Sequence, residues 1–195
     1  ATLQGGKRTR ALLCMAAGAL VDAPAHVLDD VGAAIEMMHA CTLVHDDLPA
    51  MDDDDLRRGQ PTVHVAFDEA TAILAGDALQ ALAFSALAGA DAPATLRIDW
   101  VRALADASGV AGMCGGQALD VDATGTRRST ESREPAGAAG LADPLLPLER
   151  MHALKTGALI RAAVRMGAQA GDADAATLER LDRFAAALGL AFQVR

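Results

Sequence analysis

Apolar side chains recur with the period of an α-helix along most of the chain, and no stretch alternates with the two-residue period of a half-buried β-strand. The 195 residues are enough for one domain with a core of its own. The pattern therefore predicts an all-α fold in which residues 1–195 form a single domain. The clearest apolar stripe, near the C-terminal end, consists of Leu178, Leu181, Ala185, Leu188 and Phe192.

Breaks in this period divide the chain into its expected helices. The stretch 70–88 is apolar on nearly every side, which predicts a central helix covered by neighbouring helices or by a second subunit. Residues 122–147 combine glycine, serine, threonine, proline and mixed charges without a period, which predicts a mobile surface loop. The other expected helices span residues 3–21, 27–47, 52–58, 95–112, 116–121 and 148–169.

The overall charge and the cysteines limit the partners and the compartment. A net charge of -9 and 3% aromatic residues argue against nucleic acid, whose binding needs basic stripes and stacking platforms. The longest uncharged stretch, 78–90, is too short to span a bilayer, so we expect no transmembrane segment. Cys14, Cys41 and Cys114 share no C-x-x-C spacing, and we expect buried thiols in a reducing compartment, the cytoplasm.

Six of the 26 acidic residues are crowded into residues 46–55, within the sequence HDDLPAMDDDDLRRG. Neighbouring carboxylates repel each other by about 1 kcal/mol even in water, so such a cluster normally has cations as partners. A solvated acidic turn is the alternative interpretation. The helix that leads into the cluster is almost entirely apolar, which indicates that it presents Asp46 and Asp47 from a buried element.

An acidic cluster with only oxygen ligands favours a hard ion such as Mg²⁺, with Mn²⁺ as an alternative. Mg²⁺ usually takes one or two carboxylates and completes its shell with water and substrate phosphates, so we expect a substrate that carries phosphate. Pro49 lacks an N–H and interrupts the helix. We therefore expect the chain to bulge between Asp47 and Asp52 and to return Asp52 to the face that carries Asp46.

The basic residues predict two anion sites. Only two of the 17 basic residues are lysines, and both lie close to glycine: Lys7 in GGKRTR and Lys155 in LKTG. We expect Lys7 and Arg10 to share one helical face that binds an anion. Arg57 and Arg58 follow the aspartates and would point about 100° apart on a helix, toward two separate anions.

His39 precedes Asp46 by seven residues on the same helical face. A single histidine on a helix is either a structural residue or a ligand, and the alignment with Asp46 leaves both interpretations open.

The motifs GGKRTR, HDDLPAMDDDDLRRG, GDALQALAF, GMCGGQALD, KTG and AFQ together resemble the trans-isoprenyl diphosphate synthases over nearly the whole chain. The combination of G-G-K-x-x-R with D-D-x-x-x-x-D and R-R-G is the specific part of the likeness. The resemblance implies an isoprenoid-synthase-type helical bundle around a deep central cavity and a homodimer. It also implies Mg²⁺-dependent condensation of isopentenyl diphosphate with an allylic diphosphate, dimethylallyl or geranyl, with release of diphosphate.

The resemblance also assigns roles to residues by their place in the motifs. Asp46 and Asp52, with Asp47 in support, would hold Mg²⁺ on the allylic diphosphate. Arg57 and Lys155 would bind the same diphosphate. The diphosphate of isopentenyl diphosphate would be bound by Lys7, Arg10, His39 and Arg58. The carbocation would be stabilised by dipoles of Lys155, Thr156 and Gln193.

Product length depends on the floor of the cavity. Cys41 lies five residues before the first aspartate, about 7 Å along the helix at 1.5 Å per residue, with Thr42 beside it. Members of the family that make farnesyl diphosphate often have tyrosine at this position. Cysteine is smaller, so we expect farnesyl diphosphate as the main product, with geranylgeranyl diphosphate as an alternative.

Two departures from the family pattern leave other interpretations open. The sequence ends before a second aspartate-rich motif and begins without the helix that usually precedes G-G-K-x-x-R, so we expect it to be incomplete at both ends. A catalytically silent subunit of a prenyl synthase is one alternative. An HD-type metallophosphohydrolase that uses His45-Asp46 with other histidines is a second, and a terpene cyclase is a third.

Overall fold

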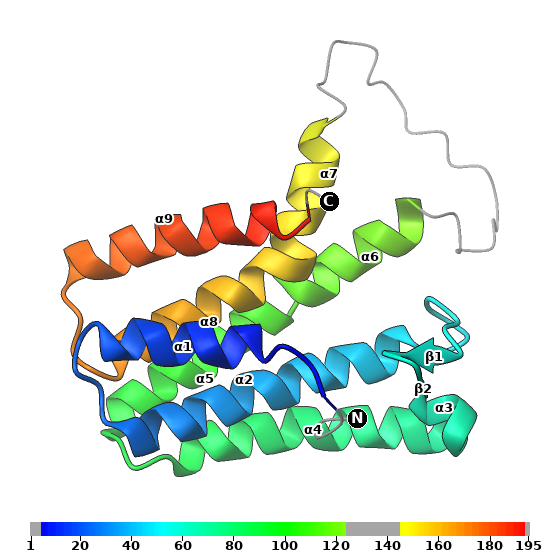
Figure 1. Ribbon diagram of the computed structural model, residues 1–195, viewed down its shortest axis with the longest axis horizontal. Coiled ribbons are helices and arrows are strands. Elements are labelled where there is room, and N and C mark those ends of the chain that lie inside the picture. The colour runs from blue at the N-terminus through cyan, green and yellow to red at the C-terminus, as the bar shows by residue number, and fades with distance from the viewer. Residues whose placement is uncertain (1–4, 124–144, 194–195) are drawn as a thin grey trace.

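The computed structural model describes residues 5–123 and 145–193 and is almost entirely helical, which confirms the expected all-α fold (Figure 1). Two short strands, β1 (Leu56–Arg57) and β2 (Gln60–Pro61), form an antiparallel pair. A π-helical segment, η1 (Ala153–Gly157), separates α7 from α8. The α-helices are α1 (Thr9–Ala19), α2 (Ala25–Asp46), α3 (Val63–Ala66), α4 (Glu69–Gly89), α5 (Ala94–Ser108), α6 (Met113–Ala123), α7 (Leu145–His152), α8 (Ala158–Gln169) and α9 (Ala175–Ala191).

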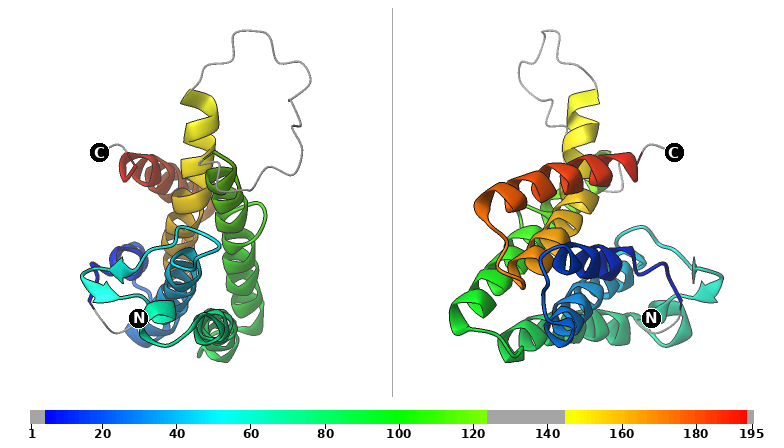
Figure 2. Two further views of the ribbon diagram at one scale, coloured as in Figure 1. Left: turned by 90° about the vertical axis from the view of Figure 1, so that its right-hand side faces the viewer. Right: turned by 60° about the vertical axis from the view of Figure 1, so that its left-hand side comes forward.

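Helix α2 is the centre of the domain. It packs against α4, α1 and α8, and Figures 1 and 2 show it running between α1 and α4. Eleven of its 22 residues are buried, because apolar side chains occupy most of its circumference. The largest fully buried side chains of the domain are Trp100, Ile35, Met38, Leu87, Leu104 and Met166.

Helix α4 is not the central helix that its apolar sequence predicted. Its buried residues are Ala72, Gly76, Ala83 and Leu87, whereas Leu74 is 67% exposed. Within residues 5–123 and 145–193, the neighbouring helices therefore leave one side of α4 uncovered, and its cover by a second subunit stays a prediction. Among the described helices, α4 is also long and apolar enough to cross a bilayer, with a mean hydropathy of 1.5; length and composition alone do not distinguish a span from a helix covered by protein.

The segment 52–58 does not form the expected helix. Asp53 has a φ of 55°, and Arg58 and Gly59 have φ values of 56° and 77°, which are incompatible with a continuous right-handed helix. Arg58 and Gly59 instead form the two-residue connection between β1 and β2, where positive φ at both positions suits the twist of a hairpin.

Other expected boundaries also shift. The first helix begins at Thr9 rather than at residue 3, and Arg8 directly before it has a left-handed φ of 49°. The segment expected as one helix over 148–169 is helical but contains the wider turn η1. In the expected loop 122–147, α6 extends to Ala123 and α7 begins at Leu145; residues 124–144 lie outside the described part. Cys14 and Cys41 are buried as expected, whereas Cys114 is exposed.

Helices α1 and α8 approach each other closely at a glycine. A Cβ built on Gly167 would lie 2.1 Å from the backbone oxygen of Cys14, well inside van der Waals contact. The interface is made of rigid backbone, so no side-chain rotation relieves the overlap.

We predict that Gly167→Ala lowers the free energy of unfolding by about 1–3 kcal/mol, because α1 and α8 must move apart. The matched control is Gly89→Ala in α4, where nothing lies within 4 Å of an added Cβ. That control should change stability by less than about 1 kcal/mol. Urea titration followed by circular dichroism measures both, and equal stability of the two variants would contradict the close approach.

Candidate active site

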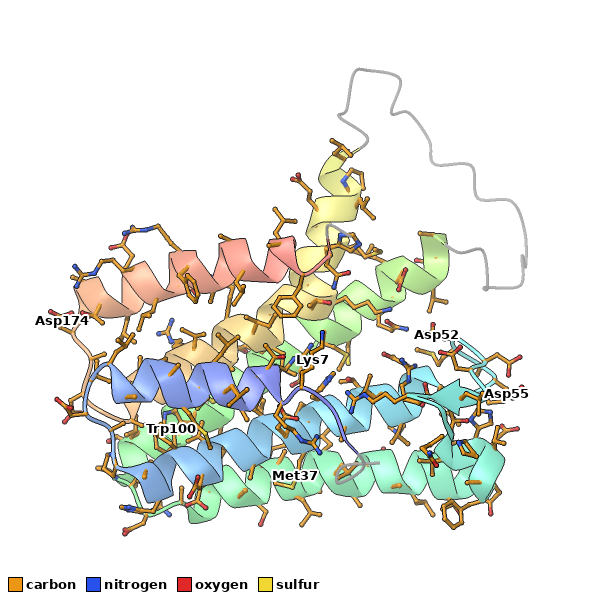
Figure 3. The ribbon with its side chains drawn as sticks, viewed as in Figure 1. Lys7, Met37, Asp52, Asp55, Trp100 and Asp174 are labelled. Carbon is orange, nitrogen blue, oxygen red and sulfur yellow. The ribbon has the colours of Figure 1, made fainter. Side chains whose placement is uncertain are left out.

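The chain reverses sharply after α2 and brings two aspartates together. Asp46 is the last residue of the helix, and the backbone N–H of Asp52 donates a hydrogen bond of 2.9 Å to the Asp46 carbonyl. A further bond of 2.8 Å from the Met51 N–H to the Leu48 carbonyl closes the turn. The bulge expected around Pro49 is therefore present. Figure 3 shows Asp52 and Asp55 in this loop beyond the end of α2.

Asp46 lies in a strongly charged environment. Burial raises the pKa of its carboxyl, the positive charge of Lys155 opposes this shift and the negative charge of Asp52 adds to it, so that the pKa is about 6. A partly buried carboxylate with a second carboxylate beside it gains from a bound cation, because the cation offsets both the burial and the repulsion.

The donor set fits Mg²⁺. Only oxygen ligands are available at Asp46 and Asp52, which suits a hard cation. Within residues 5–123 and 145–193, no three histidine, cysteine, aspartate or glutamate side chains converge as a closed metal site. An open site of one or two carboxylates is the type that Mg²⁺ uses when substrate phosphates complete its shell.

Asp47, the residue after Asp46, holds Arg57. Its side chain is 5% exposed, and its Oδ1 accepts a hydrogen bond of 2.8 Å from Arg57 Nε and a second one from Nη2 of the same guanidinium. Arg57 Nη2 also lies 3.1 Å from Asp54 Oδ2. The hydrogen bond to Asp47 raises the pKa of Arg57 and fixes the guanidinium beside the acidic turn. A metal-ligand role for Asp47 stays a prediction.

A hollow of about 510 Å³ brings together all four residues expected to bind the second diphosphate. Lys7 and Arg10 reach it although Lys7 precedes α1, so the expected common helical face is wrong but the proximity is right. Arg58 reaches it from the hairpin, and its Nη1 donates a hydrogen bond of 2.8 Å to the Gly5 carbonyl. The residues that line this hollow are Gly6, Lys7, Arg8, Thr9, Arg10, Glu36, His39 and Arg58.

The electrostatics of this hollow favour an anion. Burial, followed by the positive charges of Arg10 and Arg58, lowers the pKa of His39 to about 3, so its imidazole is neutral at physiological pH. Burial also lowers the pKa of Arg10, against the opposing effect of Glu36. The Nε of Arg10 is buried, and no described group accepts a hydrogen bond from it. A phosphate oxygen would satisfy such a donor.

The side chains of Arg57 and Arg58 point to two different places, as expected. The residues are not on a helix, however, so the expected reason for this was wrong. Arg57 faces the acidic turn through Asp47, and Arg58 faces the hollow beside Gly6. Arg57 lies in the extended strand β1 and Arg58 in the left-handed turn that follows, and this change of backbone conformation separates the two side chains. The sequence predicted that helical spacing would separate them.

The π-helical turn η1 positions the third group of predicted residues. Lys155 forms an ion pair with Asp120 of α6, and Thr156 Oγ1 accepts a hydrogen bond of 2.6 Å from Gln193 Nε2. A Cβ on Gly116 would lie 2.2 Å from the Lys155 backbone nitrogen, so α6 packs directly on this turn. Asp120 had no assigned role in the sequence, and its only signal was its place in the GMCGGQALD motif.

A cavity of about 440 Å³ lies beside Asp46 and includes both predicted chain-length residues. Cys41 and Thr42 are buried in its wall, and Thr42 Oγ1 donates a hydrogen bond of 2.8 Å to the His39 carbonyl. The other lining residues are His45, Asp46, Ala50, Met51, Gln80, Met113, Cys114, Gln117, Ala118 and Val121.

Comparison with known proteins identifies the family. The polyprenyl synthetase family model matches residues 1–195. The chain belongs to the polyprenyl synthetase family. It is 60% identical over its whole length to a probable farnesyl diphosphate synthase from Sinorhizobium fredii and covers 55% of that protein. It is 55% identical to the farnesyl diphosphate synthase of Escherichia coli, with 99% of the chain and 61% of the relative covered.

Solved structures in this family share the fold. An FPP/GFPP synthase from Zymomonas mobilis superimposes with a TM-score of 0.84 at 44% identity, covering 97% of this chain and 64% of that one. This polyprenyl synthetase chain therefore spans less than two thirds of the length of these relatives.

In this polyprenyl synthetase chain, we predict that Asp46→Asn increases stability at neutral pH. The folded state holds the Asp46 proton more tightly than the unfolded state, because burial raises its pKa from 3.8 to about 6. Stability therefore falls as the pH rises from about 4 to 6 and stays lower above that range. The variant removes this loss and should gain about 1–3 kcal/mol at pH 7.

Thermal and urea unfolding between pH 4 and 8 measure this effect. Asp53→Asn is the matched control, because Asp53 is an exposed carboxylate in the same turn and should change stability little. An Asp46→Asn protein that is no more stable than its parent at pH 7 would contradict the electrostatic account of this residue.

Proposed function

We propose that the protein is a prenyltransferase that condenses isopentenyl diphosphate with an allylic diphosphate and releases diphosphate. The observation that carries the proposal is the arrangement around α2. A cationic hollow at Lys7, Arg10 and Arg58 lies on one side, and an acidic turn with an adjoining cavity lies at the helix end. Two diphosphates with an apolar tail between them fit this division of charge.

The allylic diphosphate binds at the acidic turn. Asp46 and Asp52, with Asp47 in support, would hold Mg²⁺, or Mn²⁺ in its place. When bound, the metal neutralises negative charge on the departing diphosphate. Arg57 and Lys155 add two cations that their partners Asp47 and Asp120 hold in place.

Isopentenyl diphosphate binds in the cationic hollow. Lys7, Arg10 and Arg58 contribute positive charge, and neutral His39 contributes a hydrogen bond rather than a charge. The buried Arg10 Nε gains the acceptor that it lacks among the described residues.

The reaction begins with heterolysis of the allylic C–O bond, whose electron pair leaves with the diphosphate. The resulting cation is attacked by the terminal double bond of isopentenyl diphosphate, and the released diphosphate takes the proton that restores a double bond. The Lys155 carbonyl, Thr156 hydroxyl and Gln193 amide would stabilise the cation by their dipoles. The hydrogen bond between Thr156 and Gln193 holds these two groups in one orientation.

Farnesyl diphosphate is the proposed main product. Cys41 and Thr42 lie in the wall of the cavity where a growing tail would reach, and the relatives named above include farnesyl diphosphate synthases. Geranylgeranyl diphosphate remains the alternative, because the cysteine side chain leaves more room than tyrosine would.

The rival functions fit the geometry less well. An HD-type hydrolase needs histidine ligands, but His45 Nε2 lies 3.1 Å from the Ile73 carbonyl and His39 lies among arginines. A terpene cyclase has no need for the second anion hollow. A silent subunit has no need for Asp46 and Asp52 to be held together.

We propose a homodimer in the cytoplasm, without nucleic-acid partners. The uncovered side of α4, which includes Leu74 and Leu82, is an apolar face of the type that a second subunit covers. The net charge of -9 opposes binding to polyanions.

The function is tested by incubating the full-length protein with isopentenyl diphosphate, geranyl diphosphate and Mg²⁺. We expect farnesyl diphosphate and free diphosphate, with turnover abolished by a chelator of divalent metals. Mainly twenty-carbon product would contradict the proposed product, and no condensation would contradict the proposed reaction.

The second diphosphate site is tested by Lys7→Ala. Loss of one charge-assisted contact should raise KM for isopentenyl diphosphate by about 10- to 100-fold and leave KM for geranyl diphosphate nearly unchanged. Lys7→Arg keeps the charge and serves as the matched control. A terpene cyclase would give no such split between the two substrates.

A further inference from the structure

Glu36 of α2 is a carboxylate in a hollow whose other charged side chains are all cations. It lines the hollow beside Lys7, Arg10 and Arg58, where a negative charge repels a diphosphate. Its side chain is only 12% exposed, and no step of the proposed reaction uses it. A carboxylate that opposes the ligand of its own site needs a structural reason, and the contacts of its two oxygens supply one.

The first oxygen caps helix α1 from outside that helix. The first backbone N–H groups of a helix have no partner within it, and the side chain of the N-cap residue usually accepts a hydrogen bond from one of them. The N-cap residue of α1 is Arg8, whose guanidinium has no acceptor atom. Glu36 Oε1 instead accepts a hydrogen bond of 3.3 Å from the N–H of Ala11, the third residue of α1. A residue of α2 therefore supplies the cap that α1 lacks.

The second oxygen holds a side chain of the same segment. Arg8 Nη1 donates a hydrogen bond of 3.3 Å to Glu36 Oε2, so one carboxylate binds both the backbone and a side chain at the start of α1. Burial lowers the pKa of Arg10, and the negative charge of Glu36 opposes that shift. Neighbouring arginines thus offset the charge of Glu36, which reduces its repulsion of a diphosphate.

Glu36 is itself held in place by the packing of two helices. It lies one turn after Gly32 on α2, and a Cβ built on Gly32 would lie 3.6 Å from the Cβ of Ala11, in van der Waals contact. Helices α1 and α2 therefore meet at this point. His39, one turn further along α2, lines the same hollow. Glu36 thus connects the start of α1 to the helix that carries His39.

Resting on the proposed function, we propose that Glu36 is a positioning residue of the isopentenyl diphosphate site. Its two oxygens hold the start of α1 against α2, which fixes the places of Lys7 and Arg10 relative to His39. Glu36 does not contact the substrate, forms no bond and exchanges no proton. Displacing a binding group by about 1 Å can reduce activity about 100-fold, so fixed cations outweigh a repulsion that the arginines already offset.

The test is Glu36→Ala in the full-length protein. We expect KM for isopentenyl diphosphate to rise about 10- to 100-fold, because the start of α1 loses its anchor, while KM for geranyl diphosphate changes by less than about threefold. Repulsion alone predicts the opposite sign, since removing a carboxylate that only repelled the substrate would lower KM. Calorimetric titration with isopentenyl diphosphate alone should show the same weakening without turnover.

Glu36→Gln is the conservative variant. Its amide oxygen can still accept the hydrogen bond from the Ala11 N–H, but it has no charge to hold Arg8. We expect its KM for isopentenyl diphosphate to lie between those of the parent and Glu36→Ala, about two- to tenfold above the parent. This variant also carries the test if Glu36→Ala does not fold.

Asp174→Ala is the matched control. The Asp174 side chain caps α9 by accepting a hydrogen bond of 2.7 Å from the N–H of Thr177, the third residue of that helix, and it lies far from Lys7 (Figure 3). Both alanine variants remove the acceptor of a third helical N–H, so the thermal midpoint should fall in both. Only Glu36→Ala should raise KM for isopentenyl diphosphate.

The outcomes separate this inference from the proposed function. With an active parent, an unchanged or lower KM for isopentenyl diphosphate in the Glu36 variants would overturn the positioning role. An equal rise of KM for both substrates, or the same rise in Asp174→Ala, would indicate a general loss of structure and would overturn it as well. A parent that catalyses no condensation would instead overturn the proposed function, and this inference with it.

Discussion

The burial of helix α2 is the constraint on which the rest of the site depends. Because α1, α4 and α8 cover it, its residues have fixed directions, and the helical rise places His39 and Asp46 about 10 Å apart. His39 faces the cationic hollow, Cys41 faces the cavity, and Asp46 ends the helix at the acidic turn. One rigid element thus sets the spacing between the two proposed diphosphate sites, and the other helices contribute their groups by packing onto it.

Some charges of the candidate site are paired within the chain, and others are not. Asp47 and Asp120 each hold one cation, Arg57 and Lys155, in a fixed orientation. Other groups keep unused capacity: the pKa of Asp46 is raised by burial, and Arg10 Nε is buried without a described acceptor. Such groups reduce the stability of the fold, and on the proposed function the binding of metal and phosphate would restore it, which is the usual relation between a preorganised site and stability.

Features that depend on periodicity or on a single backbone rule were predictable from the sequence. The all-α fold followed from the apolar period, and the bulge that joins Asp46 to Asp52 followed from Pro49, which cannot continue the hydrogen bonding of a helix. The helix expected over 52–58 was wrong because left-handed residues such as Asp53 carry no reliable signal of their own. The place of α4 at the edge was missed because an apolar helix does not reveal which neighbour covers it.

The central claim is that the acidic turn after α2 binds a divalent cation together with an allylic diphosphate. The most direct measurement is a crystal structure with Mn²⁺ and an unreactive thio analogue of geranyl diphosphate, in which anomalous scattering locates the metal. The account predicts Mn²⁺ bound to Asp46 and Asp52 and to the diphosphate, with the prenyl tail in the cavity beside Cys41. A diphosphate bound elsewhere, with the Asp46 and Asp52 carboxylates facing solvent and no metal between them, would contradict it.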